Sequence, residues 1–163
     1  MQTDPGTAKP SVEWQWKRFA DLAPGELYEI LAARTAVFVV EQRCAFQDAD
    51  GFDAFAWHLL GWISGRERAL GAYLRLIGPG RKYAEPSIGR VLTTAAVRGT
   101  GLGREAMREG LARCAGLYPG MAVRIAAQQR LERFYAGMGF RPASAPYEED
   151  GILHVDMVRA ADA

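Results

Sequence analysis

The chain has 163 residues, of which 49% are hydrophobic and 24% are charged, and its formal net charge is +1. This length supports one domain with a sizeable core, and the balanced charge excludes the broad basic field of a typical nucleic-acid-binding protein. No apolar run reaches membrane-spanning length, and the polar start of the chain lacks a signal-peptide pattern. We therefore expect a cytoplasmic protein that has neither nucleic acid nor a membrane as its partner.

The cysteines and histidines are too few to indicate a disulfide framework or a metal site. Cys44 and Cys114 lie far apart and are the only two cysteines, which does not indicate a disulfide scaffold. His58 and His154 are the only histidines, and neither has ligand residues at the spacing that a metal site uses. We expect no bound metal.

The first part of the chain predicts a tail, a strand and a helix. Residues 1–10 show no periodicity and are expected to form a flexible tail, so that a single domain covers residues 11–163. Residues 12–19 alternate apolar and polar side chains, which predicts a half-buried strand. Pro24 then begins an amphipathic helix, whose pattern blurs over residues 37–42.

An acid-rich loop and a hairpin come next. Residues 47–53 lack the regular ligand spacing and the closing glutamate of a calcium loop, which favours a turn-rich loop. Residues 57–64 and 69–77 predict two strands of a hairpin, joined by a short polar turn.

The second half alternates strands and helices. A strand is expected over residues 87–97 and an amphipathic helix over 102–115, followed by a strand over 121–127 and a short helix over 131–138. The final strands are expected over the ranges 140–147 and 152–158, where Asp150-Gly151 favours a hairpin turn. This order predicts one α/β domain with a mixed sheet.

A glycine-rich turn, Arg98–Gly103, joins the strand over 87–97 to the following helix. Three glycines in five residues allow a sharp turn and a close backbone approach to a ligand. The positive end of the helix lies at the same place, and such a turn at a helix N-terminus favours an anion, usually a phosphate. Taken alone, such a turn is more often a tight connection without a ligand.

Two nucleotide-binding motifs can be tested against this turn. Gly101–Ala106 fits the pattern G-x-G-x-x-A, but there is no acidic residue between Cys114 and Leu131 to hold a ribose. A phosphate-binding P-loop requires Lys-Ser or Lys-Thr after its last glycine, whereas Arg104-Glu105 follows here. The first motif is therefore weak and the second is absent.

A third pattern combines Arg98–Gly103 with Tyr135–Phe140, about 30 residues later. This pair, together with the strand and helix order, resembles the GNAT family of N-acetyltransferases over nearly the whole chain. Residues 37–42, His58–Gly61 and Tyr147–Gly151 further resemble its ElaA-like branch. The resemblance implies the α/β GNAT acyl-CoA N-acyltransferase fold, a mixed central sheet with splayed parallel strands flanked by helices.

The resemblance also implies acetyl-CoA as the co-substrate. Its pantetheine arm is expected to pair with the strand backbone, and its pyrophosphate is expected to bind the amides of the glycine turn. Gln128 stands where the family often has an asparagine that bonds the cofactor arm. The residues that carry over to cofactor binding are Val91, Leu92, Thr93, Arg98, Gly99, Thr100, Gly101, Leu102, Gly103, Arg104, Gln128 and Tyr135.

Tyr135 corresponds to the tyrosine that protonates the departing thiolate in this family, although it could also be a plain core aromatic. The strand over 88–97 carries no carboxylate to act as a general base. Glu41 and His58 are expected to line the acceptor side, and the other candidates are Asp48, Glu149 and His154. Water is a further alternative.

The function implied is an acetyl-CoA-dependent N-acetyltransferase that moves an acetyl group directly to a primary amine of a small molecule or a peptide. One alternative is an acyl-homoserine-lactone-synthase-like acyltransferase, because Arg34–Phe38 matches an Arg-x-x-Val-Phe stretch of those enzymes. The other alternative is a non-catalytic CoA-binding module. The resemblance also admits a homodimer, since dimerisation is common in the family.

Overall fold

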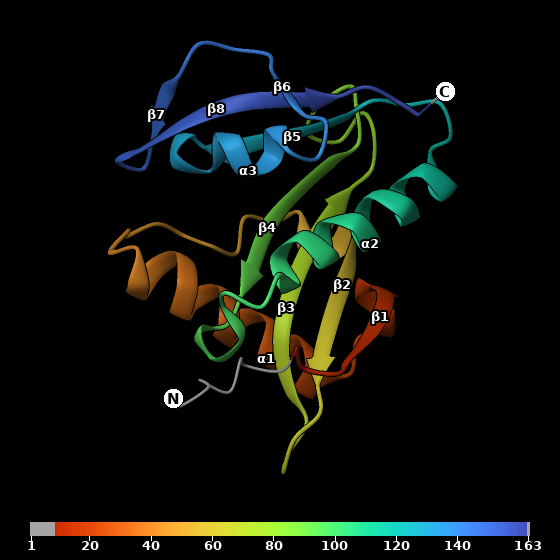
Figure 1. The fold of residues 1–163 in the computed structure, drawn as a ribbon, viewed down its shortest axis with the longest axis vertical. Helices are drawn as coiled ribbons and strands as arrows, with labels where there is room; N and C mark the ends of the chain where they lie inside the picture. Colours follow the sequence, from red (N-terminus) through yellow and green to blue (C-terminus); the bar gives the residue numbers. More distant parts are fainter. Residues whose placement is uncertain (1–8, 163) are drawn as a thin grey trace, which may run out of the picture.

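A computed structural model describes residues 9–162, in which the strands form one mixed sheet with helices on both faces (Figure 1). Residues 1–8 of the expected N-terminal tail lie outside the described residues. In chain order the strands and α-helices are β1 (Val12–Arg18), α1 (Pro24–Arg34), β2 (Ala56–Ile63), β3 (Ala69–Ile77), β4 (Ser87–Thr93), α2 (Leu102–Leu117), β5 (Val123–Gln128), α3 (Glu132–Ala136), β6 (Arg141–Pro142), β7 (Tyr147–Glu149) and β8 (Ile152–Arg159).

The sheet opens in its middle, between β4 and β5. The strand order is β1-β2-β3-β4-β5-β8-β6, with β7 also paired to β8. Strands β4 and β5 run parallel and pair only at Ser87 and Arg124, whereas the other neighbours pair antiparallel. Beyond this point the two strands diverge (Figure 1). The expected GNAT fold with splayed parallel strands is therefore confirmed.

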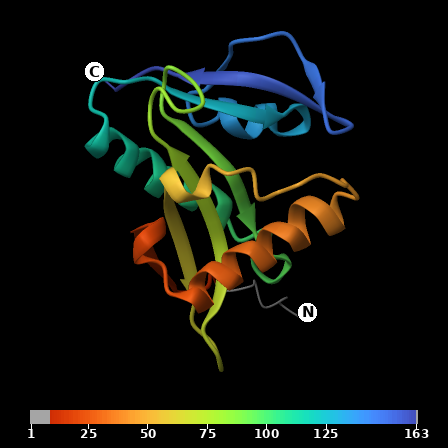
Figure 2. The same ribbon diagram turned by 180° about the vertical axis from the view of Figure 1, so that it is seen from behind.

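Helices α1 and α2 cover opposite faces of the sheet (Figures 1 and 2). Helix α1 begins at Pro24, as predicted, and Glu26 accepts a hydrogen bond of 2.9 Å from the amide of Ala23. The helix continues as a π-helix over Thr35–Glu41, which is where the sequence pattern blurs. A π-helix widens the turn and often occurs at functional sites.

Each face of the sheet has its own apolar core. The larger core lies under α2 and α3, and it includes Leu74, Ile88, Leu102, Met107, Ile125, Phe140 and Met157. The smaller core lies under α1, and it includes Ile30, Leu60, Tyr73 and Leu92. Strands β3 and β4 contribute side chains to both cores, so the sheet is packed on both faces next to the point where β4 and β5 separate.

Two of the expected strands are shorter than predicted. The strand expected over 87–97 ends at Thr93, and Ala95–Val97 forms a short 3₁₀ helix that turns the chain toward α2. The strand expected over 140–147 is reduced to β6 and the start of β7. Pro142 and Pro146 lack the amide hydrogen that a continuous strand would donate.

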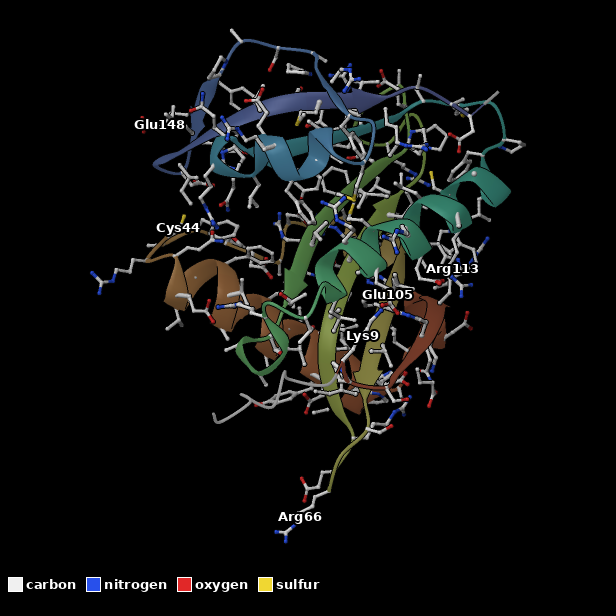
Figure 3. The ribbon with its side chains drawn as sticks, in the orientation of Figure 1. Lys9, Cys44, Arg66, Glu105, Arg113 and Glu148 are labelled. Carbon is white, nitrogen blue, oxygen red and sulfur yellow. The ribbon has the colours of Figure 1, made fainter. Side chains whose placement is uncertain are left out.

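An ion pair links the start of the described residues to helix α2. Lys9 forms an ion pair with Glu105 of α2, close to where β1 begins (Figure 3). The β2–β3 turn projects away from the body of the protein, with Arg66 at its tip (Figure 3). None of the helices within residues 9–162 is long and apolar enough to cross a membrane.

Candidate active site

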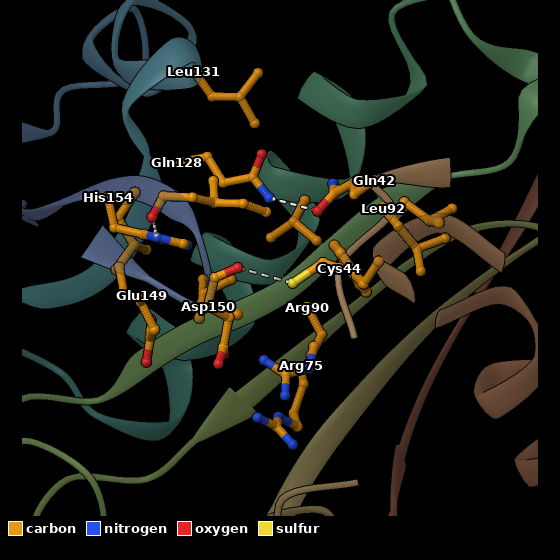
Figure 4. Close-up of a pocket in the computed structure, with 18 of the residues that line it drawn as sticks. Gln42, Cys44, Arg75, Arg90, Leu92, Gln128, Leu131, Glu149, Asp150 and His154 are labelled. Carbon is orange, nitrogen blue, oxygen red and sulfur yellow. Dashed lines mark hydrogen bonds between the residues drawn. The ribbon is translucent and has the colours of Figure 1, made fainter. Parts of the chain in front are cut away.

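The main cavity opens where β4 and β5 separate, and its volume is about 820 Å³. Strand β4, the π-helix, the segment 42–52, and the β7–β8 hairpin provide most of its walls (Figure 4). Seven of the predicted site residues line this cavity: Glu41, Val91, Leu92, Thr93, Arg98, Gln128 and Tyr135.

The glycine turn lies beside this cavity rather than in its wall, and only Arg98 belongs to both. Gly99 and Gly101 have positive φ values of 80° and 82°, which residues with a side chain adopt at a cost. Within residues 9–162, the amides from Gly99 to Arg104 donate no well-formed hydrogen bond to another backbone group. The hydroxyl of Thr100 donates to the carbonyl of Val97 at 2.6 Å and steadies the turn.

This turn has the chemistry and the space that a pyrophosphate needs. A Cβ atom added at Gly99 or Gly101 would meet no atom within 4 Å, so the turn is open on the side where these side chains would lie. Free amides at a helix N-terminus bind anions, and α2 begins at Leu102. Arg104, in the first turn of α2, lines a second cavity of about 380 Å³ together with Arg108 and Arg159.

Glu41 and Arg98 form an ion pair at the cavity mouth. Nη2 of Arg98 lies 2.8 Å from Oε2 of Glu41, and both side chains are about 40% exposed, at 44% and 40%. Arg98 also donates to the carbonyl of Thr93 at 3.2 Å. An exposed pair of this kind contributes little free energy, so Arg98 can exchange Glu41 for a phosphate at small cost. In this arrangement the carboxylate of Glu41 is the ion-pair partner of Arg98.

Two hydrogen bonds cross the mouth between the halves of the sheet (Figure 4). Nε2 of Gln128 donates to Oε1 of Gln42 at 2.9 Å, and the thiol of Cys44 donates to the carbonyl of Asp150 at 3.3 Å. They join the segment after the π-helix to β5 and to the β7–β8 turn, in the region where β4 and β5 do not pair. The amide of Gln128 is thus held at the place where a cofactor arm would pass.

Tyr135 lies on α3, is 7% exposed and lines the cavity. Its ring packs edge-on against Phe134 and Phe140, with centroid separations of 5.1 and 6.0 Å. Burial raises the pKa of the Tyr135 phenol to about 12, so the hydroxyl keeps its proton at neutral pH. A neutral phenol on the cavity wall can donate a proton.

The expectation that His58 lines the acceptor side is not met. His58 is fully buried and is not part of the cavity wall. Its Nε2 lies 2.9 Å from the carbonyl of Asp53 and its Nδ1 lies 2.7 Å from the hydroxyl of Tyr73. Since a carbonyl only accepts, Nε2–H donates to Asp53 and Nδ1 accepts from Tyr73. Both ring nitrogens are therefore used inside the core.

His154 has the opposite arrangement, with one ring nitrogen left for a ligand. It is half-buried and lines the cavity (Figure 4). Nδ1 donates to the carbonyl of Ile152 at 2.8 Å, which leaves the lone pair of Nε2 available when the ring is neutral. The ring of Tyr147 stacks on it at 6.0 Å and fixes its plane. Glu149 also lines the cavity, and its carboxylate has no ion-pair partner within residues 9–162.

The acid-rich loop has a role that its sequence did not reveal. Asp48 and Asp53 bind the buried guanidinium of Arg34 at 2.8 and 2.6 Å. Asp50 binds Arg75 through two contacts of 2.7 Å. Burial alone would raise the pKa of Asp50, but the hydrogen bonds and the charge of Arg75 outweigh it and lower that pKa.

Strand β4 contains an irregularity at the cavity that no local sequence signal marks. Arg90 has a φ of 52°, although it is not a glycine, and the register against β3 shifts between Tyr73 and Arg75. Such a bulge leaves a residue of the strand unpaired and increases its twist. Buried ion pairs hold the strained residue, because Arg90 contacts Asp48 at 2.8 Å.

Comparison with known proteins agrees with this architecture. Residues 63–161 match the family model described as an acetyltransferase (GNAT) domain. A UPF0039 protein of Synechocystis is 43% identical over 90% of this chain and 94% of its own length. The ElaA protein of Escherichia coli is 39% identical over 91% of this chain and 96% of its own length.

Within residues 9–162 no group of three or more His, Cys, Asp or Glu side chains could hold a metal ion.

Solved structures give the same result. An acyl-CoA N-acyltransferase from Pseudomonas aeruginosa superposes with a TM-score of 0.86 at 41% identity, covering 92% of this chain and 100% of that one. The fold is that of the GNAT acyltransferases. The chain belongs to the GNAT acetyltransferase family, and its close relatives are the ElaA and UPF0039 proteins.

Proposed function

We propose that this protein is an N-acetyltransferase that moves an acetyl group from acetyl-CoA to a primary amine. The observation that carries the proposal is the continuity between the turn and the cavity. The free amides of Gly99–Arg104 suit the pyrophosphate, and Arg98 links them to a cavity that ends at Tyr135. Acetyl-CoA would supply an activated acetyl thioester at the opening between β4 and β5. Val91, Leu92 and Thr93 line that opening and can hold the pantetheine arm.

In direct transfer, the amine nitrogen bonds to the acetyl carbon as the carbon–sulfur bond breaks. The amine must lose a proton, and the leaving sulfur must gain one. We assign the first role to Nε2 of His154, because it lines the cavity with a free lone pair. We assign the second role to the phenol of Tyr135. Glu41 remains a weaker candidate for the base because Arg98 already binds its carboxylate.

The acyl-homoserine-lactone-synthase alternative has less support. The synthase LasI superposes with a TM-score of 0.74 at 18% identity, which reflects the shared fold alone. The matching Arg34 is fully buried and binds Asp48 and Asp53. This is a structural role that does not depend on the reaction, so the sequence match does not favour the synthase. A non-catalytic CoA-binding module is disfavoured because both Tyr135 and His154 line the cavity.

Binding of acetyl-CoA tests the proposed donor site. Gly101→Glu should weaken binding by more than about a hundredfold, because it places a carboxylate against the pyrophosphate and blocks the open space. Isothermal titration calorimetry measures the dissociation constant. Gly120→Glu is the matched control, since Gly120 also has a positive φ of 77° and an open Cβ position but lies beyond the other end of α2. Equal affinities for both variants would contradict the site.

A further inference from the structure

The end of the cavity at the start of β4 is surrounded by charged side chains. Three arginines and three aspartates form one network there, and their formal charges cancel. Its ion pairs are 2.6–3.3 Å long and join Arg34 to Asp48 and Asp53, Arg75 to Asp50 and Asp53, and Arg90 to Asp48 and Asp50. The network thus has no carboxylate left over for another cation, and within the described residues the buried Nε of Arg75 has no hydrogen-bond partner.

Lys82 stands beside this network as an additional cation. It lines the cavity from the loop between β3 and β4, and it forms no ion pair within 4 Å among residues 9–162. Its ammonium lies 6.0 Å from the ring of Phe52 and 5.5 Å from that of Tyr83. Burial and the charges of Arg75 and Arg90 lower the pKa of Lys82 more than the nearby carboxylates of Glu149 and Asp50 raise it.

The β7–β8 hairpin supplies the opposite charge. Glu149 and Asp150 line the same cavity, and neither side chain forms an ion pair within the described part of the chain. In Figure 4 these two acids come from the β7–β8 hairpin, whereas Arg75 and Arg90 come from β3 and β4. His154 lies on the same hairpin. Within residues 9–162 the cavity therefore has a cation from the β3–β4 loop and carboxylates from the β7–β8 hairpin that form no ion pairs, which suits a molecule that carries both an ammonium group and an anionic group.

We propose that the acceptor is an amine that also carries a carboxylate, such as an amino acid or a short peptide with a free carboxyl end. The inference rests on the proposed function. Lys82 binds the carboxylate, because it is the cation that the network leaves without a partner. Glu149 attracts the ammonium, and His154 then takes its proton. A polyamine suits this cavity less well, because its second cation would approach Lys82.

Matched pairs of acceptors test this inference. Amino acids and dipeptides are compared with their carboxamides by the rate of acetyl-CoA-dependent thiol release. We expect kcat/KM to be about tenfold higher for the carboxylates, as one ion pair of about 1.4 kcal/mol gives. Lys82→Met should bring this ratio close to one, and Lys82→Arg should preserve most of it.

Arg81→Met provides the control, because Arg81 has the same charge and precedes Lys82. Its guanidinium packs on Phe55 at 4.4 Å, outside the cavity. This variant should keep the wild-type ratio. A wild-type ratio near one, or an unchanged ratio in Lys82→Met, would overturn the inference and leave the proposed function standing. If no amine in the panel releases thiol while acetyl-CoA still binds, the proposed function fails, and the inference fails with it.

Discussion

At the scale of single residues, the cavity holds a proton donor and a proton acceptor in different environments. Tyr135 lies deep on α3, where burial raises the pKa of its phenol and keeps it protonated. His154 lies nearer the surface, and a backbone carbonyl fixes its Nδ1–H, so that Nε2 can accept a proton. These opposite states suit a reaction in which one group gives a proton and the other receives one.

We expect Tyr135→Phe to lower kcat about a hundredfold while KM for acetyl-CoA changes less than about threefold, because it removes only the donor hydroxyl. His154→Gln should also lower kcat, since glutamine cannot take the proton. Steady-state kinetics with a primary amine measures both effects. An unchanged kcat in Tyr135→Phe would reduce that residue to a packing role. A larger loss in Glu41→Gln than in His154→Gln would return the base to Glu41.

At the scale of secondary-structure elements, β1 is fixed to its neighbours by Trp14. Trp14 pairs across the ladder with Gly61 of β2, and its ring lies over that glycine. Its indole Nε1 donates to Oε1 of Glu105 on α2 at 3.2 Å. One side chain therefore joins β1, β2 and α2, the helix that follows the glycine-rich turn. The absence of a side chain at Gly61 is what admits the ring.

Gly61→Ala should lower the free energy of unfolding by about 1–3 kcal/mol, because an added Cβ would lie 2.5 Å from Cζ3 of Trp14. Urea denaturation followed by circular dichroism measures this change. Gly116→Ala in α2 is the control: its added Cβ meets no atom within 4 Å, and alanine favours a helix by roughly 0.5–1 kcal/mol over glycine. Equal stability of wild type and Gly61→Ala would show that the ring shifts without cost.

At the scale of the whole molecule, the interior contains charged and titratable groups that connect the sheet to the acid-rich loop. His58 of β2 joins Tyr73 of β3 to the carbonyl of Asp53. Arg34 of α1 and Arg75 of β3 meet at the carboxylate of the same aspartate. Removing one partner would leave a buried charge without compensation, so the loop is held as firmly as the core elements.

The pH dependence of stability should report His58. Burial lowers the pKa of His58 in the folded state, so the unfolded chain binds the proton more readily. Stability is therefore fully present above the unfolded pKa of about 6.5 and is lost as the pH falls below it, by at most about 1.4 kcal/mol per pH unit. Melting temperatures between pH 7.5 and 5.5 measure this slope. His58→Gln should have a shallower slope, and identical slopes would contradict the assignment.

Several local features of the structure were predictable because they depend on neighbours in the sequence. Pro24 begins α1, and Gly99 and Gly101 adopt the left-handed backbone that their turn requires. Asp150 and Gly151 have φ values of 51° and 77°, as expected for a two-residue hairpin turn. The early end of β4 was not predicted, because the residues after Thr93 include a β-branched valine, and only the approach of α2 requires the chain to turn there.

By itself, the sequence determined the order of the elements, the glycine-rich turn before α2 and the resemblance that led to the GNAT family. Apolar periodicity, proline and glycine act over a few residues and can be read directly. Only the tertiary structure decided which polar groups reach the cavity. It buried His58, paired Glu41 with Arg98 and left His154 facing the cavity. These outcomes depend on packing between segments far apart in the chain, and no local pattern encodes which side chain meets which partner.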